Sequence, residues 1–434
     1  MITAAGDAVR AHAQALREHL AAGDFAGAEQ RCARILELDP AHVEALNVAA
    51  LAALSRDRHD AAIDLLERAL AVAAGDAATL RNLGIALRRA GRIGAARDML
   101  RRAVDADPQS FVARLDLGEA CEALADGDAA LAAYFGAIRQ AQAAGRWRND
   151  ATTAPALRAR VRHAMQVVDR GRAAWFERVV APLRERFGRD ELVRVEHGLA
   201  IHLGERPAVI ADPRQQPTLF HLPGLPATPW FERALFPWHA ELEDAFAGIR
   251  AELEALLADA SGFEPFLDIP PSVDAGAYLQ GREVAPQWNA YFFHRHGERF
   301  EANCARCPRT AAALDGLPLV RIRAHAPECL FSLLTPGSHI MPHYGVTNTR
   351  IVTHLPLIVP EDCVLRVGGE DHVWQEGRCV SFDDTFLHEA WNRSTRTRVV
   401  MLMDTWNPHM SEAEKIATGE LVAAIGDINR AAMA

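Results

Sequence analysis

The sequence lacks the features that mark secreted and membrane-spanning proteins. Its 434 residues include only seven cysteines, an odd and sparse set that argues against a disulfide framework. The opening residues, MITAAGDAVRAHAQALREHL, show no basic start followed by an apolar run, so we expect no secretory signal. No stretch approaches the roughly 20 apolar residues of a membrane-spanning helix. These absences predict a cytoplasmic protein with no membrane span.

The chain also lacks an excess of positive charge. Its formal net charge is −10, whereas proteins that bind nucleic acid non-specifically are usually basic. Nucleic acid is therefore not an expected partner. Half of the residues are hydrophobic and 24% are charged, which is the profile of a soluble globular protein. The length exceeds that of one ordinary core and predicts two or three domains.

A second CxxC pair is also missing. Cys304 and Cys307 form one such pair, and nothing completes a zinc site with it. A redox role would require a thioredoxin-like βαβ setting. Because a lone motif is weak evidence, we expect a structural or incidental role for this pair.

A period of 34 residues runs through the N-terminal third of the chain. Small residues coincide when the sequence is shifted by one period: Ala28, Ala62, Ala96 and Ala130 in one series, Gly84 and Gly118 in another. Small residues suit positions where antiparallel helices approach closely, and large apolar residues fill the seam between neighbours. The period resembles the tetratricopeptide repeat, with about three and a half units between Ala15 and Ala144.

The array admits two roles. Such solenoids usually offer a concave surface to a peptide or protein, so a polypeptide partner held by the repeats is one expectation. The alternative is that the array only packs against the other domain of its own chain or forms a dimer.

The C-terminal half shows a different pattern. Short runs rich in β-branched and aromatic residues, such as WNAYFF, CLFSLL and RVVMLMDTW, alternate with turn sequences such as TPGS and VGGED. Many short strands at this spacing predict a sandwich or barrel, and a jelly-roll or cupin-like double-stranded β-helix is the natural candidate. Propensity alone does not choose it over other β-sandwiches.

These patterns predict a multidomain α + β chain with four segments. We expect a tetratricopeptide-repeat solenoid over 1–145 and a helical connector with an irregular linker over 146–227. The β domain with flanking helices follows over 228–412, and a C-terminal helix over 413–434 completes the chain.

The densest motifs lie in the β-rich half. PGSHIMPHYGVTNTRIVTHLPL and FDDTFLHEAWNRSTRTRVVMLMDTWNP follow NAYFFHRHGERFEANCARCPRT and PECLFSLLTPGSH. Over roughly residues 228–410 this order resembles the aspartyl/asparaginyl β-hydroxylase family, in which repeats ahead of the domain are also known. The resemblance implies a dioxygenase that uses iron(II), 2-oxoglutarate and O2 to hydroxylate an aliphatic carbon, with ascorbate as a candidate stimulant.

Two histidines match the iron ligands of that family: His343, in PHYG, and His388, in FLHEAW. Iron(II) oxygenases need imidazole ligands on one face and open positions for cosubstrate and dioxygen. The wider oxygenase pattern adds a carboxylate two residues after the first histidine. This chain has Gly345 there, as members of the family do. Water is expected to complete the coordination, and Asp384, four residues before His388, is the alternative ligand.

Four further residues match the family's binding groups. Arg398 and Ser332 match residues at the distal carboxylate of 2-oxoglutarate, a role that suits the planar, permanently charged guanidinium. His354 matches a histidine that contacts the cosubstrate, and Arg350 matches a basic residue that faces the substrate. Val352 departs from the family, because that position can carry a second arginine.

Three functions stay open at this point. The resemblance favours hydroxylation of the β-carbon of Asp or Asn in a peptide or protein, with the repeats helping to hold the polypeptide. A free amino acid, another small molecule or a lipid is the alternative substrate. The third possibility is an inactive repeat scaffold for protein–protein interaction, and the intact set of matched residues argues against it.

Overall fold

The computed structural model describes residues 2–259, 262–267, 274–281 and 286–433. Contacts divide the chain into two compact units. The repeat unit comprises Met1–Ala174 and Asp427–Ala434, and the β unit comprises Trp175–Gly426. The chain crosses between them within two long helices, α9 (Arg158–Phe187) and α15 (Glu412–Met433). The first crossing falls inside the predicted connector.

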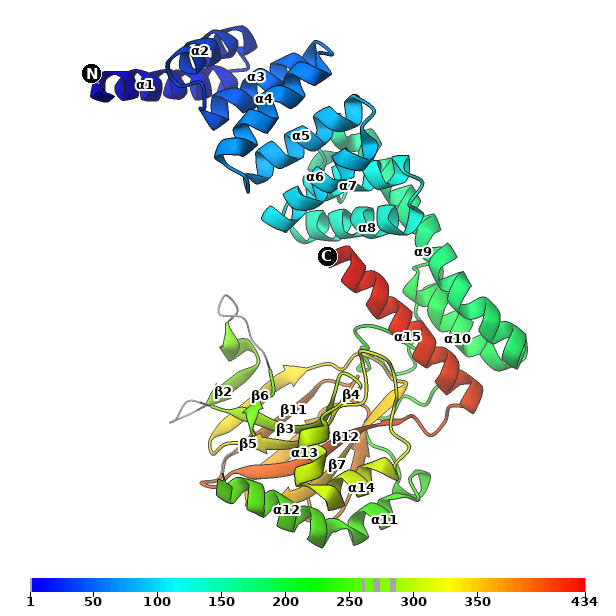
Figure 1. The fold of residues 1–434 in the computed structure, drawn as a ribbon. Coiled ribbons are helices and arrows are strands. Elements are labelled where there is room, and N and C mark those ends of the chain that lie inside the picture. The colour runs from blue at the N-terminus through cyan, green and yellow to red at the C-terminus, as the bar shows by residue number, and fades with distance from the viewer. Residues whose placement is uncertain (1, 260–261, 268–273, 282–285, 434) are drawn as a thin grey trace. The chain divides into compact units, whose positions relative to one another are not determined.

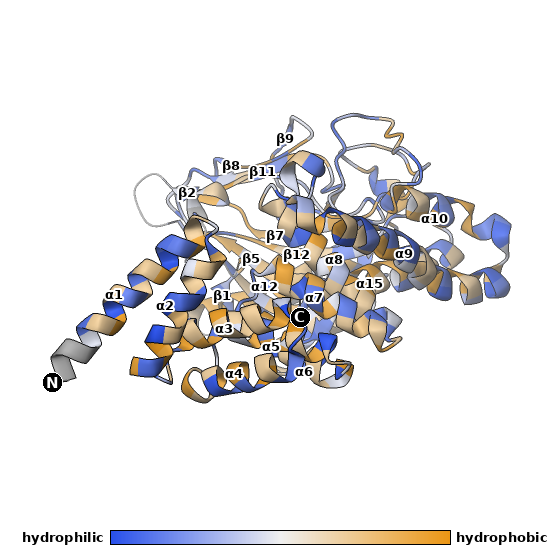
Figure 2. Cartoon of the chain, turned by 90° about the horizontal axis from the view of Figure 1, so that it is seen from above, coloured by the Kyte–Doolittle hydropathy of each residue, from blue (hydrophilic) through white to orange (hydrophobic). Residues whose placement is uncertain are grey.

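Helices follow one another in antiparallel pairs along the repeat unit (Figure 1). The pairs are α1 (Ile2–Ala21) with α2 (Phe25–Leu38), α3 (Val43–Ser55) with α4 (His59–Val72), α5 (Ala77–Arg89) with α6 (Ile93–Ala106), and α7 (Phe111–Ala123) with α8 (Gly127–Ala143). Their starts at Val43, Ala77 and Phe111 follow the 34-residue period. Asp76 and Ser110 cap α5 and α7 by accepting backbone N–H groups of the first turn. Hydrophobic and hydrophilic residues alternate around these helices (Figure 2).

The small residues of the period lie at helix contacts. The four alanines of the series are buried. A Cβ atom added to Gly84 would lie 2.5 Å from Cγ of Leu100, and one added to Gly118 would lie 2.4 Å from Cδ1 of Tyr134. Such distances are shorter than any real contact of a Cβ atom, so glycine is required at both positions. The expected close approach of the helices is therefore present.

The last helix pair packs against the C-terminal segment of the chain. Arg114 of α7 is only 3% exposed and donates to the carbonyl oxygens of Ala432 and Met433, at 3.2 and 2.9 Å. Gly136 of α8 meets the same segment so closely that a Cβ atom there would lie 2.1 Å from the carbonyl oxygen of Ala432. These contacts lie within the repeat unit, which includes Asp427–Ala434, so they test neither of the two roles expected for the array.

The β unit contains two antiparallel sheets. The larger follows the order β1 (Glu264–Pro265), β3 (Trp288–Arg295), β5 (Cys329–Leu334), β12 (Arg398–Trp406), β7 (Arg350–Ile358) and β10 (Val380–Phe382), with β4 (Glu298–Arg299) beside β3. The smaller follows the order β2 (Leu279–Gly281), β6 (Ser338–His343), β11 (His388–Asn392), β8 (Cys363–Val367) and β9 (Glu370–His372). Repeats followed by antiparallel sheets with flanking helices confirm the predicted fold class.

Each face of the larger sheet has its own apolar core. Helices α11 (His239–Asp244), α12 (Phe246–Asp259), α13 (Glu301–Arg306) and α14 (Pro308–Asp315) lie along one face (Figure 1). Phe331, Leu355 and Met401 pack in that core together with Cys304 and Cys307, which are buried free thiols. The other face meets the smaller sheet through a second apolar cluster. The space between the two sheets is therefore the interior of the β unit.

Helix α10 (Arg189–His202) follows α9 at the start of the β unit. Arg194 of α10 forms an ion pair with Glu414 near the start of α15, and Glu414 is buried. Among the described residues, no helix combines the length and apolar character needed to span a membrane.

Replacing Gly118 by alanine should destabilise the repeat unit. The added methyl group would overlap the buried ring of Tyr134, which Glu122 holds by a hydrogen bond at 2.7 Å. Overpacking of this kind costs about 1–3 kcal/mol. Gly94→Ala is the matched control, because a Cβ atom on this helical glycine meets nothing within 4 Å. Urea unfolding followed by circular dichroism should show a lower midpoint for Gly118→Ala alone, and equal midpoints would contradict the prediction.

Candidate active site

A cavity of about 230 Å³ lies between the inner faces of the two sheets. Side chains alternate along a strand, so every second residue of β12 belongs to one face. The pairing register places His354 of β7 beside Leu402, and Ser332 of β5 beside Val400. The residues on this face of β12 are Arg398, Val400, Leu402 and Asp404. The face therefore runs from a cation at one end, across an apolar middle, to a carboxylate at the other.

His343 and His388 face each other across the pair β6–β11. They are direct partners in the strand register, and their ring centroids lie 4.0 Å apart. The register then shifts, because Met341 and Pro342 of β6 lie opposite the single residue Glu389 of β11. This β-bulge turns His343 inward, where regular alternation from Ile340 would turn it outward. The bulge thus brings both histidines into the cavity.

Both imidazole rings are oriented by the backbone. Nδ1 of His343 lies 2.8 Å from the carbonyl oxygen of Met341, and Nδ1 of His388 lies 3.0 Å from that of Phe386. Since a carbonyl only accepts, Nδ1 carries the proton in each ring and Nε2 keeps its lone pair. Burial, and next the proximity of His343, lower the pKa of His388 to about 4. Both Nε2 atoms therefore keep a lone pair that can bind a metal ion.

The carboxylate of Asp384 fills the space beside Gly345. A Cβ atom added to Gly345 would lie 2.1 Å from Cγ of Asp384. One carboxylate oxygen accepts from Arg350 at 2.8 Å, and the other, Oδ1, is buried without a hydrogen-bond partner. A side chain at position 345, where other oxygenases place their carboxylate, is thus sterically excluded by Asp384. Within the described chain, no three His, Cys, Asp or Glu side chains form a metal cluster.

Arg398 is a buried cation without a carboxylate partner among the described residues. Its side chain is 2% exposed, stacks on Trp374 at 4.9 Å, and reaches only the backbone oxygen of Ser332, at 3.5 Å. Burial lowers its pKa to about 10. A buried guanidinium is costly unless a carboxylate neutralises it. The hydroxyl of Ser332 accepts from Nε1 of Trp288 at 3.0 Å, so its own proton remains available to a ligand.

His354 is a second buried residue of the same cavity whose polar atoms lack a partner among the described residues. The residue is 6% exposed, and neither ring nitrogen has a hydrogen-bond partner. Burial, followed by the charge of Arg398, holds the pKa of His354 well below its usual range. A neutral imidazole with both nitrogens unsatisfied lines the cavity as a potential ligand-binding group.

Arg350 differs from Arg398 because its charge is fully compensated. Its two terminal nitrogens donate to Asp384 at 2.8 Å and to Asp404 at 3.0 Å. Glu328 also lines this part of the cavity. We call these four residues, Glu328, Arg350, Asp384 and Asp404, the acidic end. A substrate role for Arg350 stays a prediction.

Sequence reasoning missed Glu328, Asp404 and Trp288. A signal was present for the two acids, because side chains two residues apart share one face of a strand. Asp404 follows Arg398 by an even number of residues, and Glu328 precedes Ser332 by an even number as well. Trp288 carried no comparable signal, since its contact with Ser332 joins two strands that are distant in sequence.

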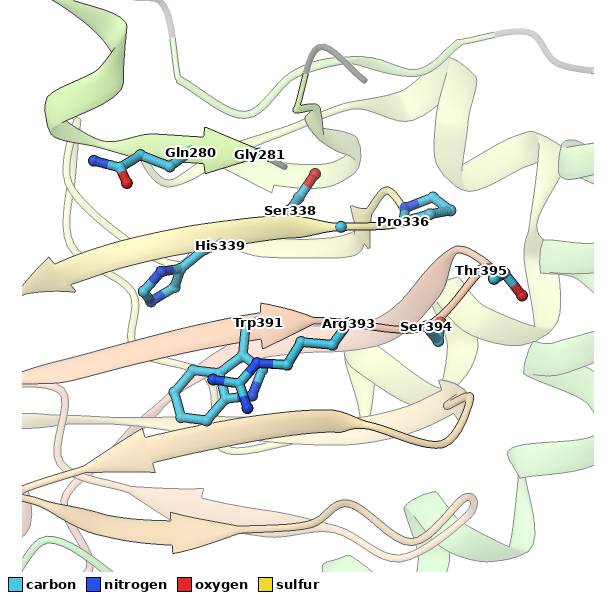
Figure 3. Close-up of a pocket in the computed structure, with 10 residues that line it drawn as sticks. Gln280, Gly281, Pro336, Ser338, His339, Trp391, Arg393, Ser394 and Thr395 are labelled. Atoms are coloured by element: carbon cyan, nitrogen blue, oxygen red, sulfur yellow. The ribbon is translucent and has the colours of Figure 1, made fainter. Parts of the chain in front are cut away.

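A larger hollow of about 620 Å³ lies over the smaller sheet (Figure 3). Its lining includes Gln280 on β2, His339 on β6, and Trp391 with Arg393 at β11. His339 bonds to Glu389 at 2.7 Å. The hollow has one histidine that is already paired, whereas three histidines and a buried arginine converge between the sheets. The inner cavity is therefore the stronger candidate.

Comparisons with known proteins give matches in both parts of the chain. Residues 243–408 match the family model described as aspartyl/asparaginyl beta-hydroxylase. Residues 44–109 and 81–145 match tetratricopeptide-repeat models. Among solved structures, the MamA protein aligns at 19% identity over 48% of this chain and 100% of its own, with a TM-score of 0.30. That score is too low to support an argument.

Curated relatives match about half of the chain or somewhat less. Aspartate beta-hydroxylase domain-containing protein 2 of Xenopus tropicalis is 35% identical, over 51% of this chain and 57% of its own length. Ornithine lipid ester-linked acyl 2-hydroxylase of Rhizobium tropici is 36% identical, over 43% and 63%. Aspartyl/asparaginyl beta-hydroxylase of Homo sapiens is 30% identical, over 46% and 25%. The chain thus spans less than two thirds of each of these relatives.

The two buried arginines should respond oppositely to replacement by methionine. Arg398→Met removes an uncompensated buried charge, so the free energy of unfolding should stay equal or rise by about 1 kcal/mol or more. Arg350→Met leaves two buried carboxylates without their cation and should lower the free energy of unfolding by about 3–5 kcal/mol. Urea unfolding of the ligand-free protein measures both. Equal losses in the two variants would show that Arg398 is compensated by the protein.

Proposed function

Because this chain carries a domain of the aspartyl/asparaginyl β-hydroxylase family behind tetratricopeptide repeats, we propose that it is an iron(II)- and 2-oxoglutarate-dependent dioxygenase that hydroxylates an aliphatic carbon. The buried guanidinium of Arg398 carries the proposal. It lacks a carboxylate partner within the described chain and faces the cavity into which His343 and His388 project. A dicarboxylate cosubstrate supplies the missing counter-charge.

The residues present fit an iron(II) ion. His343 and His388 would hold it through Nε2, and water would complete its coordination. When bound, the ion supplies oxygen activation coupled to decarboxylation of 2-oxoglutarate to succinate. Gly345 provides no ligand, and the space beside it is filled by Asp384.

Arg398 and Ser332 would bind the distal carboxylate of 2-oxoglutarate. The guanidinium lies over the ring of Trp374 at 4.9 Å and carries parallel N–H donors, which suit a bidentate carboxylate. Ser332 adds its hydroxyl proton, because Trp288 already donates to its oxygen. His354 would orient the cosubstrate with an otherwise unsatisfied ring nitrogen.

The apolar middle of the cavity would keep bulk water from the reacting carbon. It is lined by residues from both sheets and by Phe266, which directly follows β1. The residues from the sheets are Trp288, Ile340, Val352, Leu365 and Leu402. Water exclusion strengthens electrostatic interactions and suppresses side reactions in a closed site.

The family favours an Asp or Asn side chain in a peptide or protein as the substrate, hydroxylated at its β-carbon. The repeats would help to hold the polypeptide, because arrays of this type bind peptides through their extended surfaces. Two repeat-model matches within residues 44–145 support this role.

A free amino acid, small molecule or lipid is the second candidate substrate. It is favoured by Val352, which contributes no cation, and by Arg350, whose terminal nitrogens are both bonded to carboxylates. An acidic side chain therefore has no free cation at this end of the cavity. One of the relatives named above is an acyl 2-hydroxylase of a lipid.

Purified protein should form succinate from 2-oxoglutarate when iron(II) and ascorbate are present. A His343→Ala, His388→Ala double variant should fall to background, because no imidazole would remain to hold the metal. Arg398→Lys should raise the KM for 2-oxoglutarate about tenfold, a loss of about 1.4 kcal/mol, since an ammonium cannot bind the carboxylate bidentately.

His339→Ala is the matched control for the double variant. His339 lies on the same strand as His343 but in the outer hollow, so most of the turnover should persist. Because a missing substrate can suppress turnover, binding of 2-oxoglutarate with iron(II) under anaerobic conditions is measured in parallel by calorimetry. A wild-type chain that binds neither iron(II) nor 2-oxoglutarate would show the proposal to be wrong.

A further inference from the structure

The acidic end of the cavity holds more negative groups than positive ones. Three carboxylates meet a single guanidinium there, that of Arg350. Asp404 is buried, and burial raises its pKa even though Arg350 opposes this. Val352, on the same face of β7 as Arg350, adds no second cation. Excess negative charge in a poorly solvated site requires a positive partner.

Arg350 donates to the other two carboxylates of this group, Asp384 and Asp404, and none of its hydrogen bonds within the described chain reaches Glu328. Glu328 directly precedes β5, and its side chain is 14% exposed. Oε1 accepts from the backbone N–H of His296 at 2.7 Å and lies 2.9 Å from Nδ1 of that ring. No hydrogen bond of the described residues engages Oε2. Glu328 lines the cavity, so this oxygen is available to a bound molecule.

A second acceptor at the same end also lacks a donor. Oδ1 of Asp384 is buried without a hydrogen-bond partner, and Asp384 lines the same cavity. Both terminal nitrogens of Arg350 are already used by Asp384 and Asp404. The acidic end therefore offers acceptors to a ligand, while both terminal nitrogens of Arg350 already donate to carboxylates and its buried Nε has no partner among the described residues.

We propose that Glu328 determines substrate specificity by binding a protonated amine that the substrate carries near the carbon to be hydroxylated. The inference rests on the proposed function and concerns its second candidate substrate, a free amino acid, small molecule or lipid, because a peptidyl Asp side chain carries a carboxylate instead of an amine. Ser332 and Glu328 lie on one face of the same chain segment, with Leu330 between them. The cosubstrate carboxylate and the substrate amine would thus bind at opposite ends of the cavity. A carboxylate in place of the amine would be repelled by Glu328 and Asp404.

Three probes of equal chain length test the charge preference. Hexylammonium, hexanoate and hexanol are compared on the full chain with 2-oxoglutarate and Zn(II), a diamagnetic stand-in for iron, by saturation-transfer NMR and competition. Hexylammonium should bind at least ten times more tightly than the other two. Stronger or equal binding of hexanoate, or no binding by any probe, would overturn the proposal.

Glu328→Gln keeps the shape of the side chain and removes its charge. Hexylammonium affinity should fall about tenfold or more, a loss of about 1.4 kcal/mol, while hexanol binding stays the same. Glu361→Gln, at an exposed position between β7 and β8, should leave the affinities for hexylammonium and for hexanol unchanged. The thermal unfolding midpoint establishes that each variant is folded. Unchanged hexylammonium affinity in folded Glu328→Gln would overturn the proposal.

The pH dependence provides a readout that a purely structural role would not move. Burial raises the pKa of Glu328 to about 7, against the hydrogen bond from His296. The other groups that act on it are Asp404, which raises the pKa, and Arg350 and Arg295, which lower it. A raised pKa means that the negative charge is lost below neutrality. Hexylammonium should therefore bind more tightly at pH 8 than at pH 6 in the wild type, and equally at both in Glu328→Gln.

The two proposals can fail separately. Succinate formation with iron(II) depends on His343, His388 and Arg398, whereas the probe preference depends on Glu328. A chain that forms succinate but prefers hexanoate keeps the dioxygenase assignment and loses the amine assignment.

Discussion

The pairing of β12 with both β5 and β7 determines where the charged groups of the cavity lie. Antiparallel strands hold their side chains in fixed register, so Arg398, Leu402 and Asp404 form successive rows with residues of the neighbouring strands. A slip of one residue would turn all of them away from the cavity. Apolar packing on both faces of the sheet specifies this register, which is how the core positions the polar groups.

Charge compensation differs between the ends of the cavity. Arg350 is neutralised by Asp384 and Asp404 and therefore helps to hold the protein together. Among the described residues, Arg398 contacts the aromatic face of Trp374 and a distant backbone oxygen but no carboxylate. A buried group that the fold leaves unsatisfied lowers stability, and such groups are found where a ligand completes the interaction. The contrast between two arginines in one cavity is the physical basis for separating a structural cation from a ligand-binding one.

In the smaller sheet, a β-bulge determines which side His343 faces. The bulge at Met341 and Pro342 allows Ile340 and His343 to face the same side, although they are three residues apart. Backbone carbonyls then hold both imidazole rings in one tautomer. The repeat unit follows the opposite principle, because its helices are regular and a period of small residues permits their close contact. Its last pair accepts the C-terminal segment through buried Arg114.

Much of the architecture can be predicted from the sequence, because the architecture depends on the periodicity of residue types. The 34-residue period placed the small residues at helix contacts, and the motifs around His343 and His388 carried the resemblance to the family whose model matches residues 243–408. Fold class followed from short apolar runs separated by turns. These signals are local, or recur at fixed spacing, so one chain displays them without its partners.

Tertiary structure alone decided how the charges are compensated. No spacing shows that Asp384 overlies Gly345, that Arg350 is shared by two carboxylates, or that Arg398 has none, because each contact joins segments between 34 and 66 residues apart. The same holds for Glu328 and its neighbours, and for the C-terminal segment on α7. The sequence by itself determined the kinds of groups present and their order along each strand. Which group neutralises which depends on strand pairing across the sheet, and only the folded chain establishes that pairing.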